Sequence, residues 1–128
     1  MSNRNILVVV TSTGCGSCDK FKEEIWPQFQ RTLQSGNIDV VHCNLPNTAA
    51  SLNDKDTVVQ WIKGQPRKLH PNLGKLAQWY PTFLLIDETT FETNPQGKVY
   101  GGVIDNGQAK LVGGQRITSD LLYKWATQ

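Results

Sequence analysis

The sequence predicts an α/β domain in which a mixed sheet packs against helices. The first third of the chain contains an apolar run, an amphipathic helical pattern and a second apolar run, in that order. A third apolar run follows a proline, and an Asn-Gly turn between β-rich segments precedes a final helical pattern. A strand, helix and strand with short connections form a right-handed parallel crossover, which places the chain in the α/β class.

The length and composition indicate one ordinary domain. The chain has 128 residues, of which 38% are hydrophobic and 19% charged, as in soluble globular proteins. No apolar run approaches the roughly 20 residues of a membrane span, and the first run is too short for a signal peptide. We therefore expect a cytoplasmic protein with no membrane partner. The net charge of +2, with both signs interspersed, predicts no nucleic-acid partner.

The first half of the chain supplies a central strand and its crossover. Ile6 to Thr11 is a continuous apolar and β-branched run, typical of a strand covered on both faces. Cys18 to Leu33 carries large apolar residues at steps of three and four, which predicts an amphipathic helix. Pro27 inside that pattern predicts a kink or break. Ile38 to Leu45 is the second predicted strand.

A polar stretch follows, which we interpret as a helical insertion around residues 46–79. It contains two helical patches, at residues 55–63 and 73–79, separated by glycine and prolines. Trp61, Trp79 and His70 lie in this stretch; they are candidates for partner recognition, although aromatic residues at helical spacing are more often part of a core.

The last part of the chain completes the sheet. Thr82 to Asp87 is a third predicted strand. Pro81 directly precedes it, at a position where a proline removes no hydrogen bond from the sheet. Residues 98–104 and 109–112 flank an Asn-Gly pair, which predicts a hairpin whose antiparallel strands end the sheet. Ile117 to Trp125 carries apolar residues at helical spacing after Thr118-Ser119-Asp120, which can cap a helix, so we expect a closing helix there.

The residues that carry chemistry are Cys15 and Cys18, spaced Cys-x-x-Cys at a predicted strand-to-helix junction. Unpaired backbone donors at a helix start favour a thiolate over a thiol. Cys15 is then the nucleophile, and Cys18, one turn inward, resolves the mixed disulfide formed at Cys15. Gly16 and Ser17 permit the tight turn.

Zinc binding is the alternative use of this pair. A closed zinc site needs four ligands, and only His42, Cys43 and His70 remain to complete one. His42 and Cys43 are neighbours in a strand and point to opposite faces, so they make poor joint ligands. We therefore expect no metal and no other cofactor, and interpret Cys43 as a small buried hydrophobic residue.

With these elements in this order, the chain resembles the thioredoxin family over most of its length. The resemblance is carried by the first strand, the Cys-Gly-Ser-Cys turn, the second strand, Tyr80-Pro81-Thr82 before a strand, and the closing helix. It implies a thioredoxin-like three-layer sandwich, with a central mixed sheet of four to five strands flanked by helices. We therefore expect a single thioredoxin-like domain over residues 1–128, with the helical insertion around residues 46–79.

The resemblance also implies substrate-binding positions. Pro81 corresponds to a cis proline that faces the cysteines, and Tyr80 beside it offers backbone groups to an extended substrate. Gly113 corresponds to the loop glycine that a partner's backbone approaches, and Gly14 precedes the first cysteine. A trans proline that starts a strand is the alternative for Pro81, and a hairpin exit or helix lead-in is the alternative for Gly113.

The chain departs from the thioredoxin pattern at several positions. Thioredoxins carry tryptophan where this chain has Gly14, Gly-Pro where it has Gly16-Ser17, and a buried acid where it has Val9. His42 falls about where the family has a lysine paired with that acid. A histidine titrates near neutrality, so His42 is a candidate proton acceptor. The alternative is an ordinary hydrogen-bonded histidine in a strand.

Taken together, these features predict an enzyme: a protein-disulfide oxidoreductase that uses Cys15 and Cys18 as a redox-active centre and acts as a reductant. Its expected partners are protein disulfides and a dithiol reductase or oxidase that recharges it. The alternative function is a thioredoxin-fold binding or scaffold module, in which the cysteines form a regulatory disulfide with little turnover. The missing tryptophan, the missing buried acid and the long insertion favour that alternative.

Overall fold

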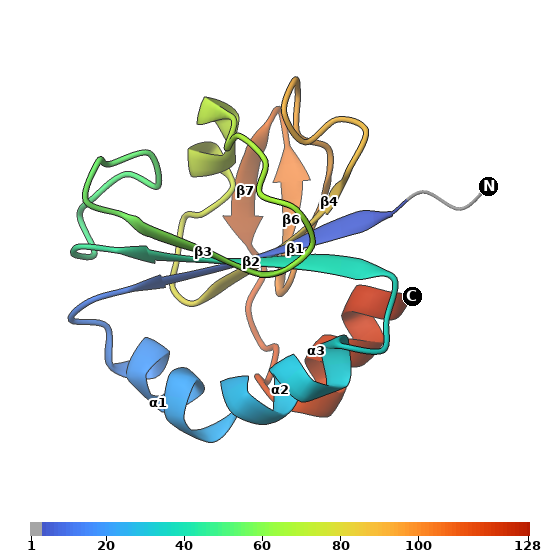
Figure 1. Cartoon of the computed structure of the whole chain (residues 1–128). Coiled ribbons are helices and arrows are strands. Elements are labelled where there is room, and N and C mark those ends of the chain that lie inside the picture. The colour runs from blue at the N-terminus through green and yellow to red at the C-terminus, as the bar shows by residue number, and fades with distance from the viewer. Residues whose placement is uncertain (1–3) are drawn as a thin grey trace.

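A computed structural model, which describes residues 4–128, confirms the α/β class and a mixed sheet (Figure 1). The main sheet has five strands in the order β3-β2-β1-β4-β5. Its strands are β1 (Asn5–Ser12), β2 (Ile38–Leu45), β3 (Val58–Lys63), β4 (Thr82–Asp87) and β5 (Gly97–Val99). A separate two-stranded sheet pairs β6 (Gly102–Asp105) with β7 (Gln108–Leu111). The helices are α1 (Gly16–Glu24), α2 (Trp26–Leu33), α3 (Ser119–Thr127) and the short 3-10 helix η1 (Pro71–Lys75).

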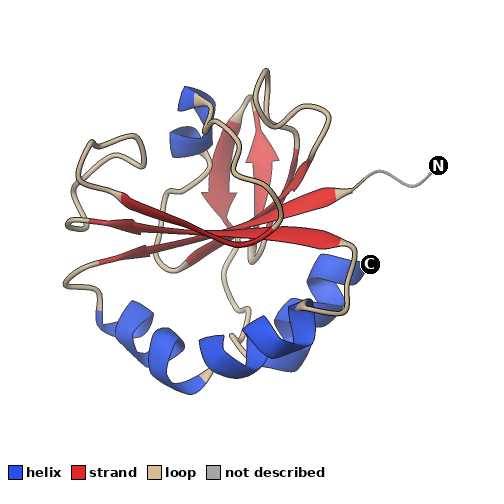
Figure 2. Ribbon diagram, in the orientation of Figure 1, coloured by secondary structure: helices blue, strands red, loops and turns tan. Residues whose placement is uncertain are grey.

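The three α-helices lie on one face of the sheet, while η1 and the β6–β7 hairpin lie on the other (Figure 2). The central strand β1 separates the two layers of core, because alternate side chains of a strand point to opposite faces. Leu7 and Val9 pack in the cluster on the helix side, and Ile6, Val8 and Val10 pack in the cluster on the other side. All five are fully buried, as expected for a strand covered on both faces.

The sheet contains the predicted parallel crossover. β1 runs parallel to β2, with Val9 opposite His42, and α1 and α2 connect the two strands. On its other side β1 is antiparallel to β4, with Val9 opposite Phe83. The loops that follow β1 and precede β4 are therefore brought together at one end of the sheet.

The break predicted at Pro27 is confirmed. One helix ends at Glu24, and a second begins at Trp26, with Ile25 between them. Proline fits the first turn of a helix, where its missing amide leaves no hydrogen bond unmade. The amide of Ile25 still donates to the Phe21 carbonyl, and Ile25 accepts from the amide of Phe29, so the two helices remain joined.

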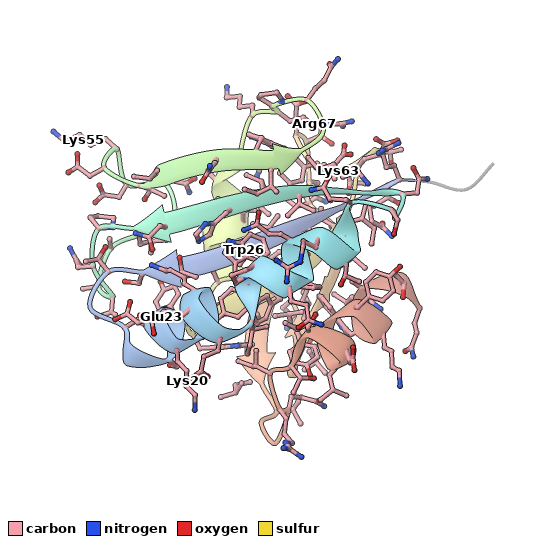
Figure 3. The ribbon with its side chains drawn as sticks, turned by 60° about the horizontal axis from the view of Figure 1, so that its bottom comes forward. Lys20, Glu23, Trp26, Lys55, Lys63 and Arg67 are labelled. Atoms are coloured by element: carbon pink, nitrogen blue, oxygen red, sulfur yellow. A yellow bond between two sulfur atoms is a disulfide. The ribbon has the colours of Figure 1, made fainter. Side chains whose placement is uncertain are left out.

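The predicted helix at residues 55–63 is wrong: Val58–Lys63 forms the edge strand β3, antiparallel to β2. Valine, tryptophan and isoleucine favour a pleated strand, and pairing with β2 satisfies the backbone groups. Lys63, labelled in Figure 3, fixes this strand to the end of α2. Its ammonium donates to the carbonyl oxygens of Leu33, Gln34 and Gly36, where a helix favours positive charge.

Two further expectations are corrected. The helical patch predicted at residues 73–79 is only the single 3-10 turn Pro71–Lys75, in which Gly74 disfavours a longer helix. The strand predicted at residues 98–104 is divided into β5 and β6 at Gly101, whose φ of 79° few other residues adopt. The helical insertion is therefore a strand and a 3-10 turn, and the hairpin forms its own sheet instead of ending the main one.

The Asn-Gly turn and the closing helix occur where the sequence predicts them. Asn106 and Gly107 have φ values of 52° and 74°, as a two-residue hairpin turn requires. The hydroxyl of Thr118 accepts from the amide of Leu121 at 3.1 Å and caps α3. None of the helices in the described residues is both long and apolar enough to cross a membrane.

Candidate active site

The Cys-Gly-Ser-Cys turn lies at the start of α1, directly after β1. Gly14 has a φ of 82° and turns the chain out of the strand, in a conformation that favours glycine. Cys15 then caps the helix: its backbone is extended, and its sulfur accepts the amide of Cys18 at 3.2 Å. Gly16 and Ser17 between the cysteines are exposed. The strand therefore ends where the first turn of the helix presents Cys15.

Cys15 and Cys18 form a disulfide, with Cα atoms 5.2 Å apart. Cys18 is fully buried, whereas Cys15 keeps 8% of its surface exposed. This difference agrees with the predicted division between an outer nucleophile and an inner resolving cysteine. The N-terminal end of a helix attracts negative charge, so the amide of Cys18 favours the thiolate of Cys15 once the disulfide is reduced.

The loop before β4 faces the cysteines, as the resemblance implies. The Tyr80-Pro81 peptide bond is cis, and the carbonyl oxygen of Tyr80 lies 3.9 Å from the sulfur of Cys15. The hydroxyl of Ser17 lies 3.8 Å from the same sulfur. A reduced Cys15 therefore has a hydroxyl and a carbonyl oxygen as polar neighbours.

A pocket of about 280 Å³, which we call the active-site pocket, connects these residues with the last loop. Ser17, Tyr80 and Pro81 line it beside the cysteines, and Gly113 lines it from the segment after β7. Gly113 has a φ of 88°, and its amide donates to the Gly101 carbonyl at 3.1 Å. Three of the predicted substrate-binding residues, Tyr80, Pro81 and Gly113, thus share one pocket. Gly14 lies in the turn before Cys15 but does not line the pocket.

The remaining walls of the active-site pocket are mostly apolar, and apart from Trp79 their residues were not predicted to belong to a site. Each lining side chain is uncharged; the others are Trp79, Phe83, Tyr100, Gly101, Leu111, Gly114, Gln115 and Ile117. Trp79 was a candidate for partner recognition within the insertion, and Tyr100 lies far from both motifs in the sequence. In the sequence, Trp79 is marked only by its position before Tyr80-Pro81, and Tyr100 only by its position in the turn before β6. Neither position indicates a pocket until the topology is known.

His42 belongs to a different set of contacts. Its Nε2 lies 2.7 Å from the hydroxyl oxygen of Thr11, and its ring packs edge-on against Trp26, with centroids 5.7 Å apart. Within residues 4–128 it makes no hydrogen bond to either cysteine of the pair. These contacts fit the alternative of an ordinary hydrogen-bonded histidine, and its role as proton acceptor stays a prediction.

The neighbours of His42 determine which ring nitrogen carries the proton. Oδ1 of Asn44 accepts from the ammonium of Lys22 at 3.1 Å and from the hydroxyl of Thr11 at 2.7 Å. The single proton of Thr11 is thereby used, so Nε2 of His42 donates to that hydroxyl and Nδ1 is unprotonated. Burial, and secondarily the positive charge of Lys22, lower the pKa of His42 from 6.5 to about 4. The ring is therefore neutral at pH 7 and a weak base.

Asn44 connects this network to the cysteine turn, a role that sequence reasoning missed. Its amide nitrogen donates to the hydroxyl of Thr13 at 3.2 Å, and the amide of Thr13 donates to the carbonyl of Leu45 at 3.0 Å. Lys22 binds the other side of Asn44 from within α1. Asn44 thus joins β2, the residues before Cys15 and the helix after it.

Cys43 lies away from the pair, in the core cluster on the face opposite the α-helices. His42 and Cys43 point to opposite faces of β2, as predicted. Burial raises the pKa of the Cys43 thiol to about 12. The described residues contain no group of three or more His, Cys, Asp and Glu side chains that could hold a metal ion.

The comparisons with known proteins give no relative to guide the assignment. No protein-family model matches the chain, and neither a curated protein nor a solved structure matches it significantly.

Proposed function

We propose that this chain is a thiol-disulfide oxidoreductase with a thioredoxin-like fold, which reduces protein disulfides through Cys15 and Cys18. The observation that carries the proposal is the Cys15–Cys18 disulfide at the start of α1, beside the cis Tyr80-Pro81 peptide. A reversible disulfide needs one accessible sulfur and one that is protected from solvent but close to it. Cys18 is fully buried, and Cys15 is the more exposed of the two at 8%, which supports this division of roles.

The proposed reaction starts from the reduced protein. The Cys15 thiolate attacks one sulfur of a substrate disulfide, an S–S bond forms to Cys15, and the other substrate sulfur leaves as a thiolate. The Cys18 thiol then loses its proton and attacks the sulfur of Cys15. The Cys15–Cys18 bond forms, and the second substrate sulfur leaves as a thiolate that takes up a proton. Two electrons pass from the protein to the substrate, and a dithiol reductase must return them.

The order of elements supports the thioredoxin-like part of the proposal. β1, the paired helices α1 and α2, and the parallel strand β2 are followed by the antiparallel strands β4 and β5 and by α3. The cysteines follow β1 and Pro81 precedes β4, so the two motifs meet because these strands are neighbours. The active-site pocket, which Tyr80, Pro81 and Gly113 line together, adds weight to the resemblance.

Repeated reduction of a protein disulfide tests the proposal. The wild-type protein, mixed with insulin and an excess of a chemical dithiol, should precipitate the insulin B chain faster than the dithiol does alone. Cys15→Ser should abolish the acceleration, because the attacking sulfur is removed and the remaining cysteines are fully buried. In a separate mixture without the chemical dithiol, Cys18→Ser that has first been reduced should leave a stable mixed disulfide at Cys15, which mass spectrometry detects.

Cys43→Ala is the matched control, since it removes a thiol that lies in the opposite core, away from the pair. It should accelerate the reaction as the wild type does. A wild-type protein that forms the disulfide but gives no acceleration would refute the proposed enzyme. It would favour instead a binding module with a regulatory disulfide.

A further inference from the structure

The exposed apolar surface of the described residues is unevenly distributed. Its large exposed apolar side chains are Val58, Val59, Val103, Leu111, Val112 and Leu121. The first two lie on the edge strand β3, at the end of the main sheet opposite β5. Val103 and Leu111 lie on the β6–β7 hairpin, Val112 directly follows β7, and Leu121 lies on α3. An exposed apolar cluster of this kind indicates an interaction surface.

Three members of that group surround a second pocket, which we call the hairpin pocket. It has a volume of about 520 Å³ and lies between the base of the hairpin and α3. Val103 and Val112 line it from the hairpin side, and Leu121 and Trp125 line it from α3. A cavity of roughly 150 Å³ already holds a benzene ring. The hairpin pocket therefore has room for a bulky apolar side chain.

The hairpin pocket adjoins the active-site pocket. Tyr100, Gly101 and Gln115 line both. Ser17 and Tyr80 line the active-site pocket and also contact the sulfur of Cys15, so the two adjoining pockets lie between Cys15 and α3. An extended polypeptide advances about 3.3 to 3.6 Å per residue, so the segment next to a substrate cysteine can extend along these pockets.

We propose that the hairpin pocket is a second binding site for the oxidised polypeptide, occupied by a bulky apolar side chain several residues away from the cysteine that Cys15 attacks. This inference rests on the proposed function. The walls that the hairpin pocket shares with the active-site pocket favour the substrate itself as the occupant. Apart from Lys124, the side chains that line the hairpin pocket are uncharged, and valine, leucine and aromatic residues predominate among them, so the pocket suits an apolar side chain.

Oxidised peptides of two lengths test the proposal. A short peptide contains the disulfide and its immediate neighbours, and longer versions extend it on one side with phenylalanine placed at successive positions in an otherwise polar tail. At one position, phenylalanine should lower KM about tenfold relative to alanine at the same position, as filling an apolar pocket does, while kcat stays the same. The same scan with aspartate should give no such position.

Substitutions on the protein locate the effect. Val112→Asp and Leu121→Asp replace side chains that are 71% and 40% exposed, so both variants should fold. Each should abolish most of the preference for the long phenylalanine peptide over the short one. Val58→Asp is the matched control, because Val58 is 64% exposed on the distant strand β3. It should keep the wild-type preference.

The outcomes separate this inference from the proposed function. If the short peptide is reduced but no phenylalanine position lowers KM, the second site does not exist and the oxidoreductase stands. If neither peptide is reduced, the proposed function fails as well. A wild-type dimer that Val112→Asp dissociates, with no change in peptide preference, would assign the surface to a second copy of the chain and overturn the inference.

Discussion

The backbone amide of Cys18 donates to the sulfur of Cys15 at 3.2 Å, so the inner cysteine helps to stabilise charge on the outer one. After reduction, the sulfur of Cys15 lies at the positive end of α1 and is more reactive than an ordinary thiol. We therefore expect iodoacetamide at pH 7 to modify Cys15 first in the reduced protein, with Cys18 slower and Cys43 unmodified. Peptide mass spectrometry after timed quenching measures the three rates.

The behaviour of Cys43 in the same experiment provides a contrast. Burial raises its pKa from 9.0 to about 12, so it stays a thiol at every pH at which the fold is normally studied. Its modification should become fast only in denaturant. Rapid modification of Cys43 in the folded protein would contradict its placement in the core.

His42 should make stability depend on pH. Its pKa is lowered from 6.5 to about 4, so between these pH values His42 is protonated in the unfolded chain but neutral in the folded protein. The contribution of His42 to the free energy of unfolding is complete above its pKa in the unfolded chain, 6.5. It is lost as the pH falls from 6.5 towards 4, and the loss is on the order of 2 kcal/mol. Urea unfolding at pH 7 and pH 4.5 measures the loss. His42→Gln, which keeps a donor for Thr11, should show a smaller loss over the same interval, and an equal loss would assign the effect to other groups.

Gly97 is required by close packing. A Cβ atom there would lie 1.9 Å from the carbonyl oxygen of Leu85, on the neighbouring strand β4. Gly97→Ala should therefore separate β5 from β4 and lower the free energy of unfolding by about 1 to 3 kcal/mol. Gly36→Ala is the control, since the nearest atom to its Cβ would be 3.7 Å away. Equal urea midpoints for the two variants would contradict the register at Gly97.

Thr118 should anchor the start of α3. Its hydroxyl accepts the amide of Leu121, and removal of such a cap costs about 1 kcal/mol. Thr118→Ala should lower the urea midpoint accordingly, whereas Thr118→Ser, which keeps the hydroxyl, should restore most of the loss. If the serine variant is as unstable as the alanine variant, the cap is not the cause.

The central strands were predicted well because a strand that is buried on both faces has a continuous apolar run in the sequence. β2 and β4 have the predicted bounds, and β1 extends the predicted run by one residue at each end. The edge strand β3 was missed because one of its edges has no neighbour and its first residues are exposed. Its apolar residues therefore do not alternate with the period that identifies a half-buried strand.

The candidate site was predictable only where a motif marks it. Cys15 and Cys18 follow from spacing and from the strand-to-helix junction, and the cis bond before Pro81 follows from the family resemblance. Tyr100 and Leu111 line the active-site pocket because the hairpin folds beside the main sheet, a tertiary placement that no local pattern encodes. The contacts of Asn44 depend equally on the register between β1 and β2.

The most direct test of the central claim is a redox titration of Cys15 and Cys18 in glutathione buffers, quenched by alkylation and read by mass spectrometry, with Cys43 as the internal control. We predict a reversible two-electron transition near the thioredoxin value of about −270 mV, as a reductant requires; a midpoint near about −120 mV would make the protein a disulfide donor instead. If no Cys15–Cys18 disulfide forms at any potential, the proposed oxidoreductase is contradicted.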